Sequence, residues 1–286
     1  MRTRRRLRLD RCALATASLV LSMLSSASLA AAQTVLTVAG CGANLGTLRQ
    51  IADAFSWAHP EVQVEILPSI GSGGAVKAIL AGAVDLGLAS RPLTDAERVA
   101  GAREILYART PLVFAVHAQS ATGAVSTREL IDIYAGGQRY WADGSVVRPV
   151  LRPTTDPDSV ILATSVPGLG EALEEAYERR GVPVAATDQQ VAELVETMPG
   201  GVGPASLAQI MSEGRGLKAL ALDGVVPSPE TLADRTYPLV KPLYFVVGPA
   251  PRPEVTELIE FARGKQGTAI LEATGHLVEP ARDLSP

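Results

Sequence analysis

The chain has 286 residues, of which 47 % are apolar, 20 % charged and 4 % aromatic, and its formal net charge is −4. This length predicts one large or two medium domains, and the apolar fraction excludes disorder as the main state. The two cysteines are too few for a disulfide-rich scaffold or for a zinc site with four cysteine ligands.

The first 32 residues have the composition of an export signal. Six of the first 11 residues are arginine, whereas the next 21 carry no charge and end in Ala30-Ala31-Ala32. A basic start, an apolar stretch and a small-residue cleavage site are typical of a signal peptide. A membrane anchor is the alternative, because the run has roughly spanning length. We expect cleavage after Ala32 and a periplasmic location for the rest of the chain; Thr3 to Leu7 also resemble part of a twin-arginine signal.

Cleavage of this segment makes the remaining chain more acidic. It removes six basic residues and one acid, which leaves 20 basic and 29 acidic residues and a net charge near −9. Such a charge argues against a nucleic-acid partner or an anionic membrane surface, since both select a basic face. Only Cys41 remains, so an internal disulfide is excluded. The letters Val38 to Cys41 also match a lipoprotein cleavage box, but they follow a strand-like run instead of the apolar segment.

Strand-like and helix-like runs alternate at the start of the mature chain. Runs rich in β-formers at 35–39, 62–66 and 83–89 are separated by runs with helical spacing at 45–57 and 74–81. This order predicts a parallel sheet with right-handed crossovers. Open α/β sheets bind ligands at the loops that follow the carboxyl ends of their strands.

The alternation continues to the end of the chain, and two of its runs are strongly apolar. Further strands are expected at 146–151 and 217–222, and helices at 127–134, 159–180, 188–197, 205–213, 255–262 and 267–274. The apolar runs at 111–116 and 239–247 have the pattern of buried strands. If both cross between lobes, residues 33–110 plus 239–286 form one lobe, residues 111–238 form the other, and a ligand binds in the hinged cleft between them.

Glycine-rich loops follow the first two strands and are candidates for anion binding. Gly71-Ser72-Gly73-Gly74 precedes a helix, where glycines admit close backbone approach and unpaired N–H groups carry partial positive charge. A tight turn with Ser72 as helix N-cap is the alternative. The run Gly40 to Gly46 resembles a loosened dinucleotide fingerprint whose third glycine is one place late. A second loop that presents N–H groups to the same cleft is the simpler interpretation.

Ser90-Arg91 ends the third strand beside these loops. An arginine there would bind an oxyanion through two hydrogen bonds, and a solvated strand end is the alternative. The three histidines are far apart in sequence, and we expect surface or packing roles for His59, His117 and His276. No serine–histidine–aspartate order, acid pair or metal-ligand spacing stands out, so we expect no enzyme activity, no metal and no cofactor.

Several of these segments together resemble the phosphate-binding proteins of ABC importers. The similarity is most specific at residues 71–77 with 83–93 and at Tyr237-Pro238-Leu239-Val240-Lys241-Pro242-Leu243-Tyr244, and Gly200 to Gly203 resembles a turn of the family. The resemblance implies an α/β fold of two Rossmann-like lobes with mostly parallel sheets joined by two hinge crossings, the type II periplasmic binding protein fold. It also implies capture of phosphate or a related oxyanion as the small-molecule ligand, with an ABC permease in the membrane as partner.

The candidate ligand-binding residues combine the glycine-rich loops with positions that match this family. They are Ala43, Asn44, Gly71, Ser72, Gly73, Ser90, Arg91, Arg152 and Thr155. Arg152 and Thr155 are the members expected to close on the ligand from the second lobe.

Two departures from the family pattern bear on the ligand. The first loop carries Gly42-Ala43-Asn44 where the family has hydroxyl side chains. Asp156-Pro157-Asp158-Ser159 stands where the family has Ser-Gly-Thr after its arginine. Two carboxylates there repel a divalent anion unless they cap the helix, pair with Arg152 or accept a hydrogen bond from the ligand. A periplasmic sensor or interaction module with the same fold is therefore the alternative function.

Overall fold

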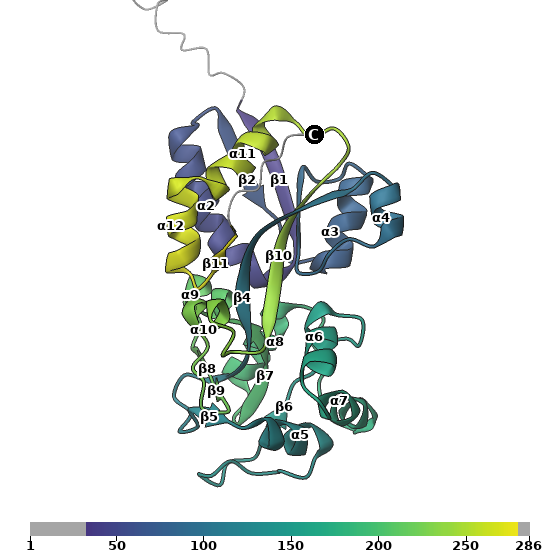
Figure 1. Ribbon diagram of the computed structural model, residues 1–286, viewed down its shortest axis with the longest axis vertical. Coiled ribbons are helices and arrows are strands. Elements are labelled where there is room, and N and C mark those ends of the chain that lie inside the picture. The colour runs from purple at the N-terminus through teal and green to yellow at the C-terminus, as the bar shows by residue number, and fades with distance from the viewer. Residues whose placement is uncertain (1–32, 280–286) are drawn as a thin grey trace, which may run out of the picture. The chain divides into compact units, whose positions relative to one another are not determined.

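The computed structural model describes residues 33–279, and those from Thr34 onward belong to one compact unit (Figure 1). The expected export signal, residues 1–32, lies outside the described residues, as do residues 280–286. Within the described part, no helix combines the length and apolarity needed to cross a bilayer.

One sheet runs through the described chain. Its strands lie in the order β2 (Val62–Ile66), β1 (Thr34–Gly40), β3 (Leu86–Ala89), β10 (Val240–Val247), β4 (Arg103–His117), β7 (Gly201–Ser206) and β6 (Arg148–Pro149). The short strands β8 (Leu217–Ala219) and β11 (Leu277–Val278) also pair with β4, and β5 (Ala124–Val125) pairs with β9 (Ala221–Leu222). The pairs β1–β2, β1–β3 and β6–β7 are parallel, as expected for strands joined by helical crossovers, whereas β10 and β4 run antiparallel to their neighbours.

The strands β4 and β10 lie side by side along the middle of the molecule (Figure 1). β4 has 15 residues and is longer than the expected apolar run at 111–116. Its first half pairs with β10, from Arg103 opposite Val247 to Pro111 opposite Val240. Its second half pairs with β7 and β8. The early part of β4 escaped prediction because its side chains are only partly buried and break the apolar run.

The expected helices are present with shifted ends, and two short helices, α4 and α10, were not expected. They are α2 (Leu45–Ala58), α3 (Gly71–Leu80), α4 (Asp95–Val99), α5 (Thr127–Ala135), α6 (Pro157–Ser165), α7 (Leu169–Glu178), α8 (Asp188–Thr197), α9 (Leu207–Glu213), α10 (Pro229–Ala233), α11 (Pro253–Arg263) and α12 (Lys265–Ala273), with a 3-10 turn η2 (Gly42–Asn44) before α2. The region expected as one helix at 159–180 is divided into α6 and α7, because Pro167 lacks an N–H group and Gly168 adopts a left-handed φ of 84°.

Buried apolar side chains form three clusters: one is called the middle core, and the other two, which share strands, are together called the outer core. The middle core contains only residues between Leu112 and Leu239. The outer core contains residues between Leu36 and Ala108 and between Val246 and Leu271, together with Leu243 and Phe245. In Figure 1, α2, α11 and α12 lie on one side of the strands of the outer core and α3 on the other. The cores divide the chain at the same strands as the predicted lobes; that they move as hinged lobes stays a prediction.

His276 is a packing residue, as expected, and makes the fold sensitive to acid. Its side chain is 1 % exposed, and Nδ1 lies 2.9 Å from the carbonyl oxygen of Leu271 and 3.2 Å from Oγ1 of Thr274. Burial lowers the pKa of His276 to about 4, below the ordinary 6.5.

We expect the free energy of unfolding to fall as the pH drops from about 6.5 to about 4, because only the unfolded chain then takes up a proton at His276. The full contribution is on the order of 3 kcal/mol. Urea denaturation at pH 7 and pH 4.5 measures it, and His276→Gln should remove this part of the pH dependence. An equal loss of stability in the parent and in His276→Gln would contradict the prediction.

Candidate functional site

Charged and polar groups from both cores meet where β1 ends. We call the following residues the junction cluster: Cys41, Gly42, Arg152, Asp156, Asp158, Asp188 and Lys241. They come from the loop after β1, the first turns of α6 and α8, the segment before α6, and β10.

Gly40 directs the loop after β1 toward α8. Gly40 has φ 153°, and a Cβ atom there would lie 2.1 Å from the carbonyl oxygen of Leu88. The next residue, Cys41, donates its N–H to that same oxygen at 2.9 Å. This close approach of β1 to β3 requires glycine and leaves the N–H of Gly42 facing α8.

Lys241 is the centre of charge in the junction cluster. Its Nζ lies 2.8 Å from Oδ1 of Asp188 and 2.7 Å from Oδ1 of Asp158. All three side chains are at most 2 % exposed. A buried ammonium group needs such partners, because its desolvation otherwise costs several kcal/mol.

Arg152 forms the second positive centre. Its Nη2 lies 2.5 Å from Oδ2 of Asp156 and 3.7 Å from Oδ2 of Asp188, and Nη1 donates to the carbonyl oxygen of Ala185. Asp156 is also the N-cap of α6, since its carboxylate accepts the N–H of Asp158. Both carboxylates that depart from the family pattern therefore have partners inside the protein.

Asp188 joins the two cores through its carboxylate. Oδ2 accepts the N–H of Gly42 at 3.1 Å and lies 3.8 Å from Sγ of Cys41, while Oδ1 contacts Lys241. Burial opposes ionisation of Asp188, but the charges of Lys241 and Arg152 more than offset it and lower its pKa below the ordinary range.

The other ionisable groups of the junction cluster respond to the same burial. Burial raises the pKa of Asp158 above its ordinary value, and Lys241 only partly offsets this effect. Burial, with the charge of Asp188 adding to it, raises the pKa of the Cys41 thiol to about 12. The thiol is therefore uncharged near neutral pH, which slows its reaction with electrophiles.

The structure brings Ser72 and Ser90 together beside this cluster. Ser72 Oγ accepts the N–H of Ser90 at 2.9 Å and lies 3.2 Å from Ser90 Oγ, and both side chains are buried. Ser72 is the second residue of α3 and not its N-cap; Ile70 precedes the helix without a side-chain cap. The hydroxyl of Ser90 in turn interacts with the Cys41 thiol, which connects the two serines to the junction cluster.

Ala43 and Asn44, in the loop after β1, are buried and form hydrogen bonds to residues outside the junction cluster. The carbonyl oxygen of Ala43 accepts a hydrogen bond from Ser206 Oγ at 3.0 Å. Asn44 donates from Nδ2 to the hydroxyl of Tyr107 at 2.6 Å, while its Oδ1 has no hydrogen-bond partner among the described residues.

The remaining candidates lie apart from the cluster. Arg91 forms two hydrogen bonds to the carboxylate of Glu97, at 2.8 and 2.7 Å, so its guanidinium is directed to α4. Gly73 and Thr155 are exposed, and Gly71 begins α3 with φ 69°. Of the predicted side chains, the structure therefore assembles those of Ser72, Ser90 and Arg152.

Three residues of the cluster were missed by the sequence reasoning. Lys241 carried a signal, because it is the one charged residue in the apolar run 239–247. Asp188 carried none, since an acidic residue in the first turn of a helix is common. Cys41 was considered only for a disulfide or a lipid anchor.

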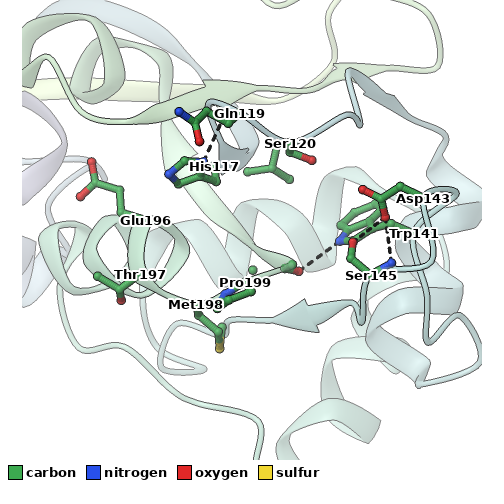
Figure 2. A pocket seen from close by; sticks show the side chains of 13 residues that line it. His117, Gln119, Ser120, Trp141, Asp143, Ser145, Glu196, Thr197, Met198 and Pro199 are labelled. Carbon is green, nitrogen blue, oxygen red and sulfur yellow. Dashed lines mark hydrogen bonds between the residues drawn. The ribbon is translucent and has the colours of Figure 1, made fainter.

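A separate cavity of about 330 Å³ lies within the residues of the middle core (Figure 2). His117, Trp141, Ser145 and Glu196 are among the residues that line it, and Trp141 donates from Nε1 to the carbonyl oxygen of Gly200. None of the predicted ligand-binding residues lines this cavity. The junction cluster is therefore the candidate site.

The chain matches the model of one family, described as the PBP superfamily domain, over residues 25–265. A phosphate-binding protein, PstS 2 of Streptococcus agalactiae, is 29 % identical over 108 residues, which are 38 % of this chain and 36 % of that protein. The matched segment thus spans about a third of the length of that relative.

Solved structures of binding proteins share the fold. A putative phosphate ABC transporter substrate-binding protein with bound phosphate, from Clostridium perfringens, is 20 % identical with a TM-score of 0.73, over 86 % of this chain and 100 % of that chain. The periplasmic molybdate-binding protein of Azotobacter vinelandii is 18 % identical with a TM-score of 0.61, over 84 % and 98 %. The expected type II periplasmic binding protein fold is confirmed, and the matched proteins are binding proteins, not enzymes.

Removal of the shared ammonium group should destabilise the fold strongly. Lys241→Met leaves Asp158 and Asp188 buried without their main cation, and we expect a loss of about 3–5 kcal/mol in the free energy of unfolding. Arg91→Met is the matched control: its pair with Glu97 is partly exposed, so about 1 kcal/mol or less is expected. Urea denaturation compares the two, and equal losses would contradict a special role for Lys241.

Proposed function

The chain belongs to the PBP superfamily, and from that premise we propose that it is an exported solute-binding protein that captures a small oxyanion, phosphate or a relative of it, for an ABC importer. The proposal rests on the groups that surround the carboxylate of Asp188 in the junction cluster. The N–H of Gly42 and the cations Arg152 and Lys241 surround a carboxylate, which is itself an oxyanion. A solute with the same kind of oxygen atoms fits these donors.

Further donors lie next to that position. Ser72 and Ser90 place two buried hydroxyl groups near Cys41, at the start of α3, where helix N–H groups favour negative charge. The donors come from both cores, since Ser72 belongs to the outer half of the chain and Arg152 to the middle half. A solute held between them links the cores and excludes water from its own oxygen atoms, which strengthens each hydrogen bond.

The charge of the protein makes local donors essential. With a net charge near −9 after loss of residues 1–32, the whole molecule repels an anion at long range. Asp156 and Asp158 add little to that repulsion, because Arg152 and Lys241 pair with them. Binding then depends on short-range donation from N–H, hydroxyl and guanidinium groups.

A sensor or interaction module without solute transport is the second candidate. The observation in its favour is that the carboxylate of Asp188 already uses the donors of Gly42 and Lys241. In that case the protein would act through a surface that binds a partner and not through a bound solute.

Isothermal titration calorimetry with phosphate, sulfate and methylphosphonate tests the solute-binding proposal. Ser72→Ala removes one buried hydroxyl, and we expect the affinity for the bound anion to fall by about 10- to 100-fold, the value of one hydrogen bond to a charged group. Ser145→Ala removes an exposed hydroxyl that bonds to Asp143, and it should leave the affinity unchanged. Equal affinities of the parent and Ser72→Ala would place anion binding away from this site.

A further inference from the structure

The junction cluster contains three carboxylates but only two cations, so one carboxylate has no cation of its own. Lys241 with Asp158 and Arg152 with Asp156 form two matched ion pairs. The fifth charged group, Asp188, is the surplus carboxylate. Its pKa is lowered, so it carries its charge at neutral pH and the five side chains sum to −1 when all are ionised.

Asp188 contacts the groups that an external anion would need. Its Oδ2 accepts a hydrogen bond from the N–H of Gly42, and the same oxygen lies 3.7 Å from the guanidinium group of Arg152. Its Oδ1 accepts a hydrogen bond from Nζ of Lys241 at 2.8 Å. One carboxylate thus receives a backbone donor from the outer half of the chain and cations from β10 and from the segment before α6.

The β1 loop is shaped to receive this carboxylate. A Cβ atom on Gly42 would lie 2.1 Å from Oε1 of Gln189 and 2.9 Å from Oδ2 of Asp188. Gln189 adds a hydrogen bond from Nε2 to the carbonyl oxygen of Gly42 at 2.9 Å. The first turn of α8 therefore contacts both the N–H and the carbonyl oxygen of Gly42, and a side chain at this position would displace the ends of the Gln189 and Asp188 side chains.

We propose that Asp188 is a built-in anion that occupies the solute position and competes with an external oxyanion, so that the solute binds only when this carboxylate leaves Gly42. This inference rests on the proposed function and specifies how that site is regulated. A tethered group competes at a high effective concentration, because α8 holds it next to its donors. The apparent affinity for the solute is the intrinsic affinity reduced by the fraction of molecules in which Asp188 is displaced.

Asp188→Asn tests the proposal with the smallest change of shape. The amide has the same shape, and its loss of charge leaves the two matched ion pairs, so the cluster becomes neutral. Asp143→Asn is the matched control, since Asp143 accepts hydrogen bonds only from nearby Ser145 on the surface. Both are prepared in full-length protein with Cys12→Ser, so that Cys41 is the single thiol.

Two measurements report on the same carboxylate. Calorimetry with inorganic phosphate gives the affinity, and the rate of reaction with N-ethylmaleimide reports on the Cys41 thiol, which is 3 % exposed, lies 3.8 Å from Asp188 and responds both to exposure and to the loss of the neighbouring charge. For Asp188→Asn we expect phosphate to bind at least about 10-fold more tightly and Cys41 to react at least about 10-fold faster. Bound phosphate should slow the thiol reaction again, and Asp143→Asn should match the parent.

The outcomes separate this inference from the proposed function. Equal phosphate affinities of the parent and Asp188→Asn overturn the built-in anion and leave the solute-binding function intact. A faster thiol reaction in Asp188→Asn without binding of any anion supports the closing role of Asp188 and overturns the solute-binding function. If neither the affinity nor the thiol rate changes, the inference fails.

A second variant displaces the carboxylate without changing the charge. Gly42→Ala places its methyl group against the ends of the Gln189 and Asp188 side chains, and we expect it to change both measurements in the same direction as Asp188→Asn. If folded Gly42→Ala reacts with N-ethylmaleimide at the rate of the parent, the contact between Asp188 and Gly42 does not close the site.

Discussion

The buried ammonium group of Lys241 is the constraint around which this protein is organised. It lies on β10, the strand that pairs with β3 of the outer core on one side and with β4 on the other. A charge at 1 % exposure is tolerated only with carboxylates at contact distance. Two helices of the middle half of the chain, α6 and α8, provide them from their first turns. The need to neutralise one side chain thereby fixes two helices against a central strand.

This arrangement also explains the composition of the loops. Asp156 and Asp158 would be unfavourable next to a free anion, yet each pairs with a cation of the same cluster. Gly42 leaves room for the ends of the Gln189 and Asp188 side chains, which occupy the space beside it. Arg91 is withdrawn from the region by Glu97, which forms a capping box with Thr94 as well. Local pairing of charges thus decides which polar groups of the family pattern remain available.

The fold is shared with binding proteins for two tetrahedral oxyanions, while the loops are this chain's own. At 18–20 % identity the shared feature is the path of the chain through the sheet and its helices. Cys41 and Ser90 directly follow the carboxyl ends of β1 and β3, and Ser72 contacts Ser90; open α/β sheets in general bind ligands at this edge. Variation of function on a constant scaffold is concentrated in loops of this kind.

The sequence by itself determined the fold class and much of the order of the elements, but not strand β7 or the first half of β4. The alternation of β1, α2, β2, α3 and β3 and the apolar runs within β4 and β10 follow from local periodicity, which depends on neighbouring residues alone. It also placed Ser72 at a helix start. The charge partners were beyond its reach: Gly42 and Asp188 are 146 positions apart, and Lys241 and Asp158 are 83 apart. Which carboxylate neutralises which cation depends on distances in space, and the tertiary structure alone decided that an aspartate of α8 lies among the N–H group of Gly42 and the cations Arg152 and Lys241.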